Sequence, residues 1–135
     1  MFKLIIPCFG DQSENLKNLS NSIDCQKTDF DVETFFLEDK ISDNFRKDLE
    51  SLCSKSPNKF FVQNHGERLY ALKNICRFLD SFDWSDEEDD CIIGLIDGDD
   101  YIWGNDCLQN VKDEYDKGFD CVWTKNDWEG FNLNH

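Results

Sequence analysis

Basic residues are scarce in this chain. Its 135 residues include 14 Lys and Arg but 29 Asp and Glu, so the formal net charge is −15. Proteins that bind nucleic acid or anionic membranes present basic patches, so we expect neither as a partner. The apolar fraction of 39% and the aromatic fraction of 14% still suffice for a packed core. The sequence therefore predicts one acidic folded domain.

Long apolar runs and paired cysteines are missing as well. No stretch approaches the roughly 20 apolar residues that a membrane-spanning helix needs, and the apolar start of the chain is too short for a secretory signal. The seven cysteines are scattered singly, without a CxxC pair. This spacing argues against a disulfide framework or a zinc site and suits a reducing compartment. We therefore expect a cytoplasmic protein with no membrane span.

Strand-like and helix-like patterns alternate along the chain. The expected strands are residues 1–7, 31–39, 58–64, 91–97 and 119–125, and the expected helices are residues 11–26, 42–53, 66–82 and 105–118. Such alternation implies crossover connections, and so an α/β fold with a mostly parallel sheet sandwiched by helices. The run "CIIGLID" at 91–97 is expected to be the central, most buried strand. Residues 1–125 form the domain, the acidic run 86–90 is a solvated loop, and residues 126–135 form a polar tail.

Capping residues and apolar stripes indicate where these helices begin and which of their faces are buried. Ser42 or Asp43 is expected to cap the second helix, and Asp11 or Ser13 the first. One face of the third helix carries an apolar stripe, which we expect to be buried. Its members are Leu69, Leu72, Cys76 and Leu79.

Four of the expected strands have candidate site residues at their carboxyl ends. They are Pro7, Glu38 and Asp39, Asn64, and the Asp97–Asp99 segment. In open parallel sheets ligands bind at the carboxyl ends of the strands. The sequence therefore predicts a binding site at this edge of the sheet.

Three carboxylates crowd the end of the fourth strand. Asp97 and Asp99 are two residues apart, so their side chains point to the same side, and Gly98 allows a close approach to the backbone. With Asp100, they would repel one another unless a cation lies among them. Such hard oxygen ligands suit Mg²⁺ or Mn²⁺, which keep coordination positions for a substrate's phosphates. The alternative is a solvated acidic turn, which would be preferred for an isolated DxD. The apolar strand before it and the other polar strand ends favour a metal–phosphate site.

Three other site types are excluded by position. An EF-hand loop beginning at Asp97 would need a carboxylate where Leu108 stands. A haloacid-dehalogenase-type phosphatase has its nucleophile on the first strand and Thr or Val where this chain has Tyr101. A dinucleotide-binding fold is excluded because no GxGxxG follows the first strand.

Four blocks in the right order carry a family resemblance. They are "LIIPCFGDQSENLKNLSNSI", "FFLEDKISDNF", "NHGERLYALKNI" and "DDCIIGLIDGDDYIWGNDCL". Together they resemble the N-terminal half of a family 2 nucleotide-sugar glycosyltransferase of the GT-A fold, over about residues 3–125. The resemblance implies a truncated GT-A-like fold. One departure is Lys40-Ile41, where the family usually has Gly-Ser.

The resemblance implies roles for particular residues in nucleotide binding. Asp39 would bind the base, with the backbone near Pro7 beside it, and Asp97 would lie near the ribose and the metal. Lys73 or Arg68 would reach the diphosphate. For Lys73 and Arg68 an ordinary solvated position on the protein surface is an equal alternative.

The resemblance also implies a divalent cofactor, Mn²⁺ or Mg²⁺. Asp99 would be its main ligand, with Asp97 beside it and Asp100 in support. No catalytic base is assigned, because family members carry it in an acceptor-binding half. Asp127 and Glu129 lie in the tail without a matching motif.

These roles imply a metal-dependent glycosyltransferase. It would move a sugar from a nucleotide diphosphate donor, expected to be a UDP-sugar, to an unknown acceptor with inversion. The alternative is a non-catalytic nucleotide- or metal-binding remnant, or a fragment that lacks the acceptor half. Apolar surface around Trp123 and Trp128 would permit self-association.

Overall fold

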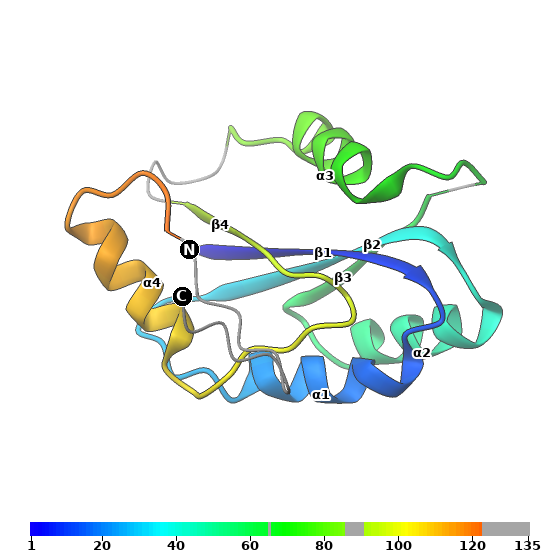
Figure 1. Cartoon of the computed structure of the whole chain (residues 1–135), viewed down its shortest axis with the longest axis horizontal. Coiled ribbons are helices and arrows are strands. Elements are labelled where there is room, and N and C mark those ends of the chain that lie inside the picture. Colours follow the sequence, from blue (N-terminus) through cyan, green and yellow to red (C-terminus); the bar gives the residue numbers. More distant parts are fainter. Residues whose placement is uncertain (65, 86–90, 123–135) are drawn as a thin grey trace, which may run out of the picture.

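The chain forms an α/β sandwich in a computed structural model that describes residues 1–64, 66–85 and 91–122. The strands are β1 (Phe2–Gly10), β2 (Val32–Ile41), β3 (Lys59–Val62) and β4 (Ile92–Leu95), and the helices are α1 (Ser13–Asp24), α2 (Asp43–Ser54), α3 (Tyr70–Ser81) and α4 (Cys107–Asp116). The strands pair in parallel in the order β3-β2-β1-β4. In Figure 1, α3 covers one face of the sheet, while α1, α2 and α4 lie on the other. The predicted fold class is confirmed.

Strand β1 contributes to the cores on both faces of the sheet. Leu4 and Ile6 belong to the core beneath α1, α2 and α4, whereas Ile5 belongs to the core beneath α3, with Phe35 and Phe78. Successive side chains of a strand point to opposite faces. A strand buried on both faces therefore reads as an unbroken apolar run, which is the pattern seen at the start of the sequence.

The first two helices lie close to their predicted positions. Ser42 is the N-cap of α2, and its hydroxyl accepts a hydrogen bond from the Phe45 N–H at 3.1 Å. Helix α1 begins after Gln12, which caps it without a side-chain hydrogen bond. The carboxylate of Asp11 instead accepts from the Ser13 N–H. Ser42 is thus confirmed as a cap, and neither candidate cap of α1 is the N-cap residue.

Strand β1 continues three residues beyond Pro7, where the sequence predicted its end. Its pairing with β4 ends at Ile5, whose carbonyl also accepts from the Ile96 N–H. Backbone groups of residues 5 and 7 point to the same side of a parallel strand. The missing N–H of Pro7 therefore faces the side that β4 has already left, and the pairing with β2 continues to Gly10.

The expectation that residues 91–97 form the central strand is wrong. In the sheet of the described residues β4 lies at an edge, and Ile93 and Leu95 are exposed on the α3 side. Its other face packs tightly, because a Cβ added to Gly94 would lie 2.7 Å from the Phe2 ring. The apolar run identified a strand correctly, but such a run does not determine how many neighbours the strand has.

The predicted buried stripe of the third helix is also wrong in part. Leu72 is 75% exposed and Cys76 is exposed, whereas Asn74 and Phe78 are buried. The helix begins at Tyr70, not at residue 66. The Asn74 side-chain amide donates to the Glu38 carbonyl at 3.0 Å, which turns this polar residue toward the sheet. A buried amide must be hydrogen-bonded, so this contact helps to fix the rotation of the helix.

The last helix ends as predicted, but the strand expected after it does not form over its described part. Gly118 follows α4 in the left-handed conformation, with φ of +98°, as is common after a helix. Residues 119–122 are not a strand. Residues 123–125, the acidic run 86–90, the tail 126–135, and thus Trp123 and Trp128, lie outside the described residues. Among the residues that are described, none of the helices is long and apolar enough to cross a membrane.

Candidate functional site

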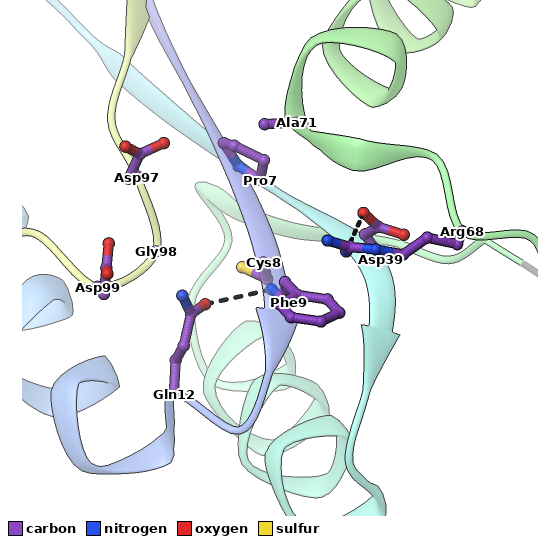
Figure 2. A pocket seen from close by; sticks show the side chains of 10 residues that line it. All are labelled: Pro7, Cys8, Phe9, Gln12, Asp39, Arg68, Ala71, Asp97, Gly98 and Asp99. Carbon is purple, nitrogen blue, oxygen red and sulfur yellow. Dashed lines mark hydrogen bonds and ion pairs between the residues drawn. The ribbon is translucent and has the colours of Figure 1, made fainter.

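A pocket opens at the carboxyl end of the sheet, between the ends of β1, β2 and β4 (Figure 2). Its volume is about 230 Å³, somewhat below the roughly 300–1,000 Å³ of a site that encloses a drug-sized ligand. It would therefore enclose only part of a large ligand. The pocket is lined by Pro7, Cys8, Phe9, Gln12, Asp39, Arg68, Ala71, Asp97, Gly98 and Asp99.

One end of the pocket is built around Asp39, which lies near the end of β2 and just before Lys40, whose φ is +49°. The residue is 2% exposed, and its carboxylate accepts from the Leu69 N–H at 2.9 Å and the Tyr70 N–H at 2.8 Å. It also accepts from Arg68 Nη1 at 2.6 Å. Asp39 thus satisfies backbone donors at the start of α3, which has no side-chain cap of its own. A carboxylate offers about four acceptor sites, so three of them are in use.

Two aromatic rings enclose Arg68 beside this carboxylate. The guanidinium carbon lies 3.5 Å from the centre of the Phe9 ring and 4.2 Å from that of Tyr70. Tyr70 has a φ of +61°, a conformation that costs a non-glycine residue free energy. This end of the pocket therefore presents flat aromatic and guanidinium surfaces next to a buried acceptor.

Glu38, the neighbour of Asp39, is a structural support beside the pocket. It is 2% exposed, forms an ion pair with Arg46 of α2, and accepts from the Asn64 N–H at 2.8 Å. It does not line the pocket. Because consecutive strand residues point to opposite faces, Glu38 holds the α2 side of β2 while Asp39 faces the pocket and α3.

The other end of the pocket carries the three aspartates predicted as a metal site. One carboxylate oxygen from each of Asp97, Asp99 and Asp100 lies within 4.8 Å of the others, and all three side chains are exposed. The pKa of Asp100 is raised, first by partial burial and then by the charges of Asp99 and Asp97. A divalent cation would relieve this repulsion and prefers such oxygen ligands. The donor set therefore fits Mg²⁺ or Mn²⁺.

Hydrogen bonds from the first helix hold the loop that carries these aspartates. The Asn15 side-chain amide donates to the carbonyls of Gly98 at 3.4 Å and Asp100 at 3.0 Å. Within the loop, the Asp100 N–H donates to the Asp97 carbonyl at 3.0 Å. The loop that carries the carboxylates is thus held both by the Asn15 side chain of α1 and by a backbone bond of its own.

Gly98 and Gln12 meet where this loop touches the end of β1. A Cβ at position 98 would lie 2.4 Å from Gln12 Oε1 and 3.0 Å from the Pro7 carbonyl oxygen. Gln12 Oε1 also accepts from the Phe9 N–H at 3.3 Å. A side chain at position 98 would therefore push the Gln12 amide aside and crowd the Pro7 carbonyl.

The structure brings together most of the sequence-predicted site residues. Pro7, Asp39, Asp97 and Asp99 line one pocket, and Asp100 lies beside Asp99. Lys73 is not among the lining residues, and its ammonium pairs with an exposed Glu67 at 3.1 Å.

Some site residues differ from the sequence-based expectation. Arg68 lies at the Asp39 end, not beside the aspartate cluster. Phe9 and Gln12 line the pocket but were not among the predicted residues. No motif singled them out, because their roles depend on the bend between β1 and α1.

The fold is similar to that of S. aureus TarS, a glycosyltransferase. By sequence the chain matches no described family and no curated protein. The TarS crystal structure superposes with a TM-score of 0.63 at 19% identity, covering 86% of this chain and 19% of that one. The crystal structure of TarS residues 1–349 gives a TM-score of 0.61 at 20% identity, covering 86% and 32%.

The chain has a glycosyltransferase-like fold. It spans less than a third of the longer TarS chain and about a third of the shorter one. At this identity the similarity establishes the fold, while the chemistry depends on the pocket.

Proposed function

We propose that this chain binds a nucleotide-sugar donor with Mn²⁺ or Mg²⁺ and takes part in glycosyl transfer as a family 2-type glycosyltransferase. The observation that carries the proposal is the arrangement of one pocket. A buried acceptor, Asp39, lies beside the Phe9 ring at one end, and two members of the three-aspartate cluster, Asp97 and Asp99, line the other. A nucleoside diphosphate has a matching arrangement, with a flat base at one end and a charged diphosphate at the other.

In this proposal Asp39 accepts from the nucleobase, next to Phe9 and near the backbone of Pro7. Three of its acceptor sites are already used, so the base reaches the remaining one or takes the place of Arg68. Uracil has both a flat ring and an N–H donor, so a UDP-sugar is the simplest donor that fits.

At the other end Asp97, Asp99 and Asp100 would hold the cation. Without one, the three carboxylates would repel a diphosphate. When bound, the metal supplies Lewis-acid stabilisation of the departing nucleotide diphosphate. As the bond between sugar and phosphate breaks, the sugar gains positive character and the departing diphosphate gains negative charge, which the metal stabilises. Asp97, which also lines the pocket toward Pro7, would lie between the metal and the ribose.

Transfer to an acceptor with inversion also needs a base to remove the proton of the acceptor hydroxyl. We assign no residue of this chain to that role. The acceptor and the base are therefore open parts of the proposal, and binding of the donor is the part that the pocket supports.

The first test is titration calorimetry with UDP, in the presence and absence of Mn²⁺. We expect Mn²⁺-dependent binding, and a loss of affinity of about tenfold or more in Asp99→Asn. Asp48→Asn is the matched control, because it removes one carboxylate charge from an exposed position on α2. UDP binding that is absent, or that is independent of both Mn²⁺ and Asp99, would contradict the proposal.

A second measurement separates transfer from binding. Release of UDP from a panel of UDP-sugars should be Mn²⁺-dependent and lost in Asp99→Asn. Metal-dependent binding without any release would limit the function to donor binding, as expected for a chain that works with a separate acceptor-binding part.

A further inference from the structure

Gln12 lies at the boundary between the bend after β1 and the aspartate loop, with its side-chain amide in a fixed orientation. Its Oε1 accepts from the Phe9 N–H, so the amide nitrogen must point the other way. A flipped amide would place two N–H groups against each other. Figure 2 shows the nitrogen on the side of the pocket where Asp99 lies. Gln12 and Asp99 also line a second, polar hollow together.

The amide nitrogen of Gln12 has no hydrogen-bond partner within the part of the chain that the structure describes. Asn15 is a useful contrast, since its Nδ2 already donates to two carbonyls of the aspartate loop. Of the side chains that line the pocket at the ends of β1, β2 and β4, only Gln12 and Arg68 carry nitrogen donors. Arg68 is committed to Asp39 at the far end. Among the described residues that line this pocket, Gln12 is therefore the side-chain N–H donor that is not committed to another group.

A diphosphate at this end would meet a surface of acceptors. Asp97 and Asp99 are carboxylates, and the nearby Pro7 contributes only a carbonyl oxygen. A cation can neutralise part of the ligand's charge, but phosphate oxygens that face away from it still need donors. Hydrogen bonds to charged oxygens are among the stronger ones in proteins.

We propose that Gln12 donates a hydrogen bond from Nε2 to a phosphate oxygen of the bound nucleoside diphosphate and so positions the leaving group. This inference rests on the proposed function, and it adds a phosphate-binding residue that comes from the bend between β1 and α1. The tether to Phe9 holds the donor in place before the ligand arrives, which limits the entropy lost on binding.

Gln12→Glu is the most informative variant. The carboxylate can still accept from the Phe9 N–H, so the tether is retained, but the N–H donor becomes a negative oxygen. Asn21→Asp is the matched control, because it makes the same amide-to-carboxylate change at an exposed position of α1 outside the pocket. Circular dichroism and thermal unfolding of each variant check that the fold is intact.

The experiment compares UDP with uridine, which lacks phosphate, by calorimetry at saturating Mn²⁺. Gln12→Glu should weaken UDP binding by about tenfold or more and leave uridine binding within about twofold of wild type, with Asn21→Asp unchanged for both. Mn²⁺ binding measured without nucleotide should not weaken in Gln12→Glu.

The other possible results separate a wrong role for Gln12 from a wrong proposed function. Equal losses for UDP and uridine, no loss in Gln12→Glu beyond that of Asn21→Asp, or weaker Mn²⁺ binding would each overturn the role of Gln12 while leaving the proposed function standing. Failure of the wild type itself to bind UDP would overturn the proposed function, and this inference with it.

Discussion

Arg68 and Asp39 form an ion pair, with 2.6 Å between Nη1 and Oδ2, that joins the start of α3 to the end of β2. The Asp39 side chain is 3% exposed and that of Arg68 is 26% exposed. The same carboxylate accepts from the backbone N–H groups of Leu69, the N-cap of α3, and Tyr70, its first residue. One side chain therefore both orders a helix and presents an acceptor to the pocket.

The first prediction concerns the stability that this carboxylate provides. Asp39→Ala should lower the free energy of unfolding by about 2–4 kcal/mol, because it leaves buried N–H groups and a largely covered guanidinium without their carboxylate acceptor. Urea unfolding followed by circular dichroism measures the change. Glu67→Ala, which breaks the exposed pair with Lys73, should cost no more than about 0.5 kcal/mol. Equal losses in the two variants would show that Asp39 does not support α3.

The second prediction concerns pH and the aspartate cluster. The pKa of Asp100 is raised in the folded chain by partial burial and by Asp99 and Asp97. A carboxyl with a raised pKa favours the folded state at low pH, and this contribution is lost as the pH rises through the raised pKa. Without metal, Asp100→Asn should therefore be more stable than wild type at pH 7, by less than about 1 kcal/mol because solvent screens the exposed charges.

The advantage of Asp100→Asn should vanish below the ordinary carboxyl pKa of 3.8, where the wild-type group is protonated in both states. Thermal unfolding of both proteins from below this pKa up to pH 7 measures the difference in stability. Added Mn²⁺ should make wild type the more stable protein at pH 7, because wild type keeps one more metal ligand than Asp100→Asn. An advantage that is independent of pH would show that repulsion among the carboxylates is not its cause.

The third prediction concerns Lys40, which follows Asp39 with a φ of +49°. The family that this chain resembles usually has glycine there, and the backbone conformation is one that glycine adopts without strain. Lys40→Gly should stabilise the chain by up to about 1 kcal/mol, and Lys40→Val should destabilise it by about 1–2 kcal/mol. Lys47→Gly on the exposed side of α2 is the control, and there glycine should cost about 1 kcal/mol. A loss in both glycine variants would contradict the strain at Lys40.

The fourth prediction concerns the cap of α2. Ser42→Ala removes the acceptor of the Phe45 N–H and should lower the free energy of unfolding by about 1 kcal/mol. Ser51→Ala lies on the exposed side of the same helix and should leave stability unchanged or slightly raised, since alanine is the better helix former. Chemical denaturation compares the two. A similar small effect in both would mean that the hydroxyl of Ser42 adds nothing to the helix.

The sequence was a good guide wherever the determining interactions are local. Ser42 caps α2 as predicted, and Phe45 and Leu49, four residues apart on that helix, are both buried on one face. The aspartates at 97, 99 and 100 needed no tertiary information to be recognised as a cluster, because they are neighbours in the chain. The order of strands and helices likewise follows from the periodicity of apolar residues.

The same reasoning failed where distant contacts outweigh local pattern. Leu72 has the spacing of a buried residue but is exposed, because Asn74 and the start of α3 are bound to the end of β2. Lys73 occupies a place that the resemblance associates with the ligand, yet it pairs with Glu67 outside the lining of the pocket. A helical stripe defines one face of a helix, but only the contacts across the fold decide which face turns inward.

The sequence by itself determined the α/β architecture, the segments that form it, and the presence of a carboxylate cluster at the end of β4, since each depends on residues close in the chain. Tertiary structure alone decided that β4 lies at the edge of the described sheet, that Asp39 and the aspartates line one pocket, and that Gln12 lies against the aspartate loop. These relationships join residues far apart in the chain, such as Phe2 and Ile92, which pair 90 positions apart, and the free energy of such contacts depends on how whole elements pack. No local pattern of residues encodes that packing.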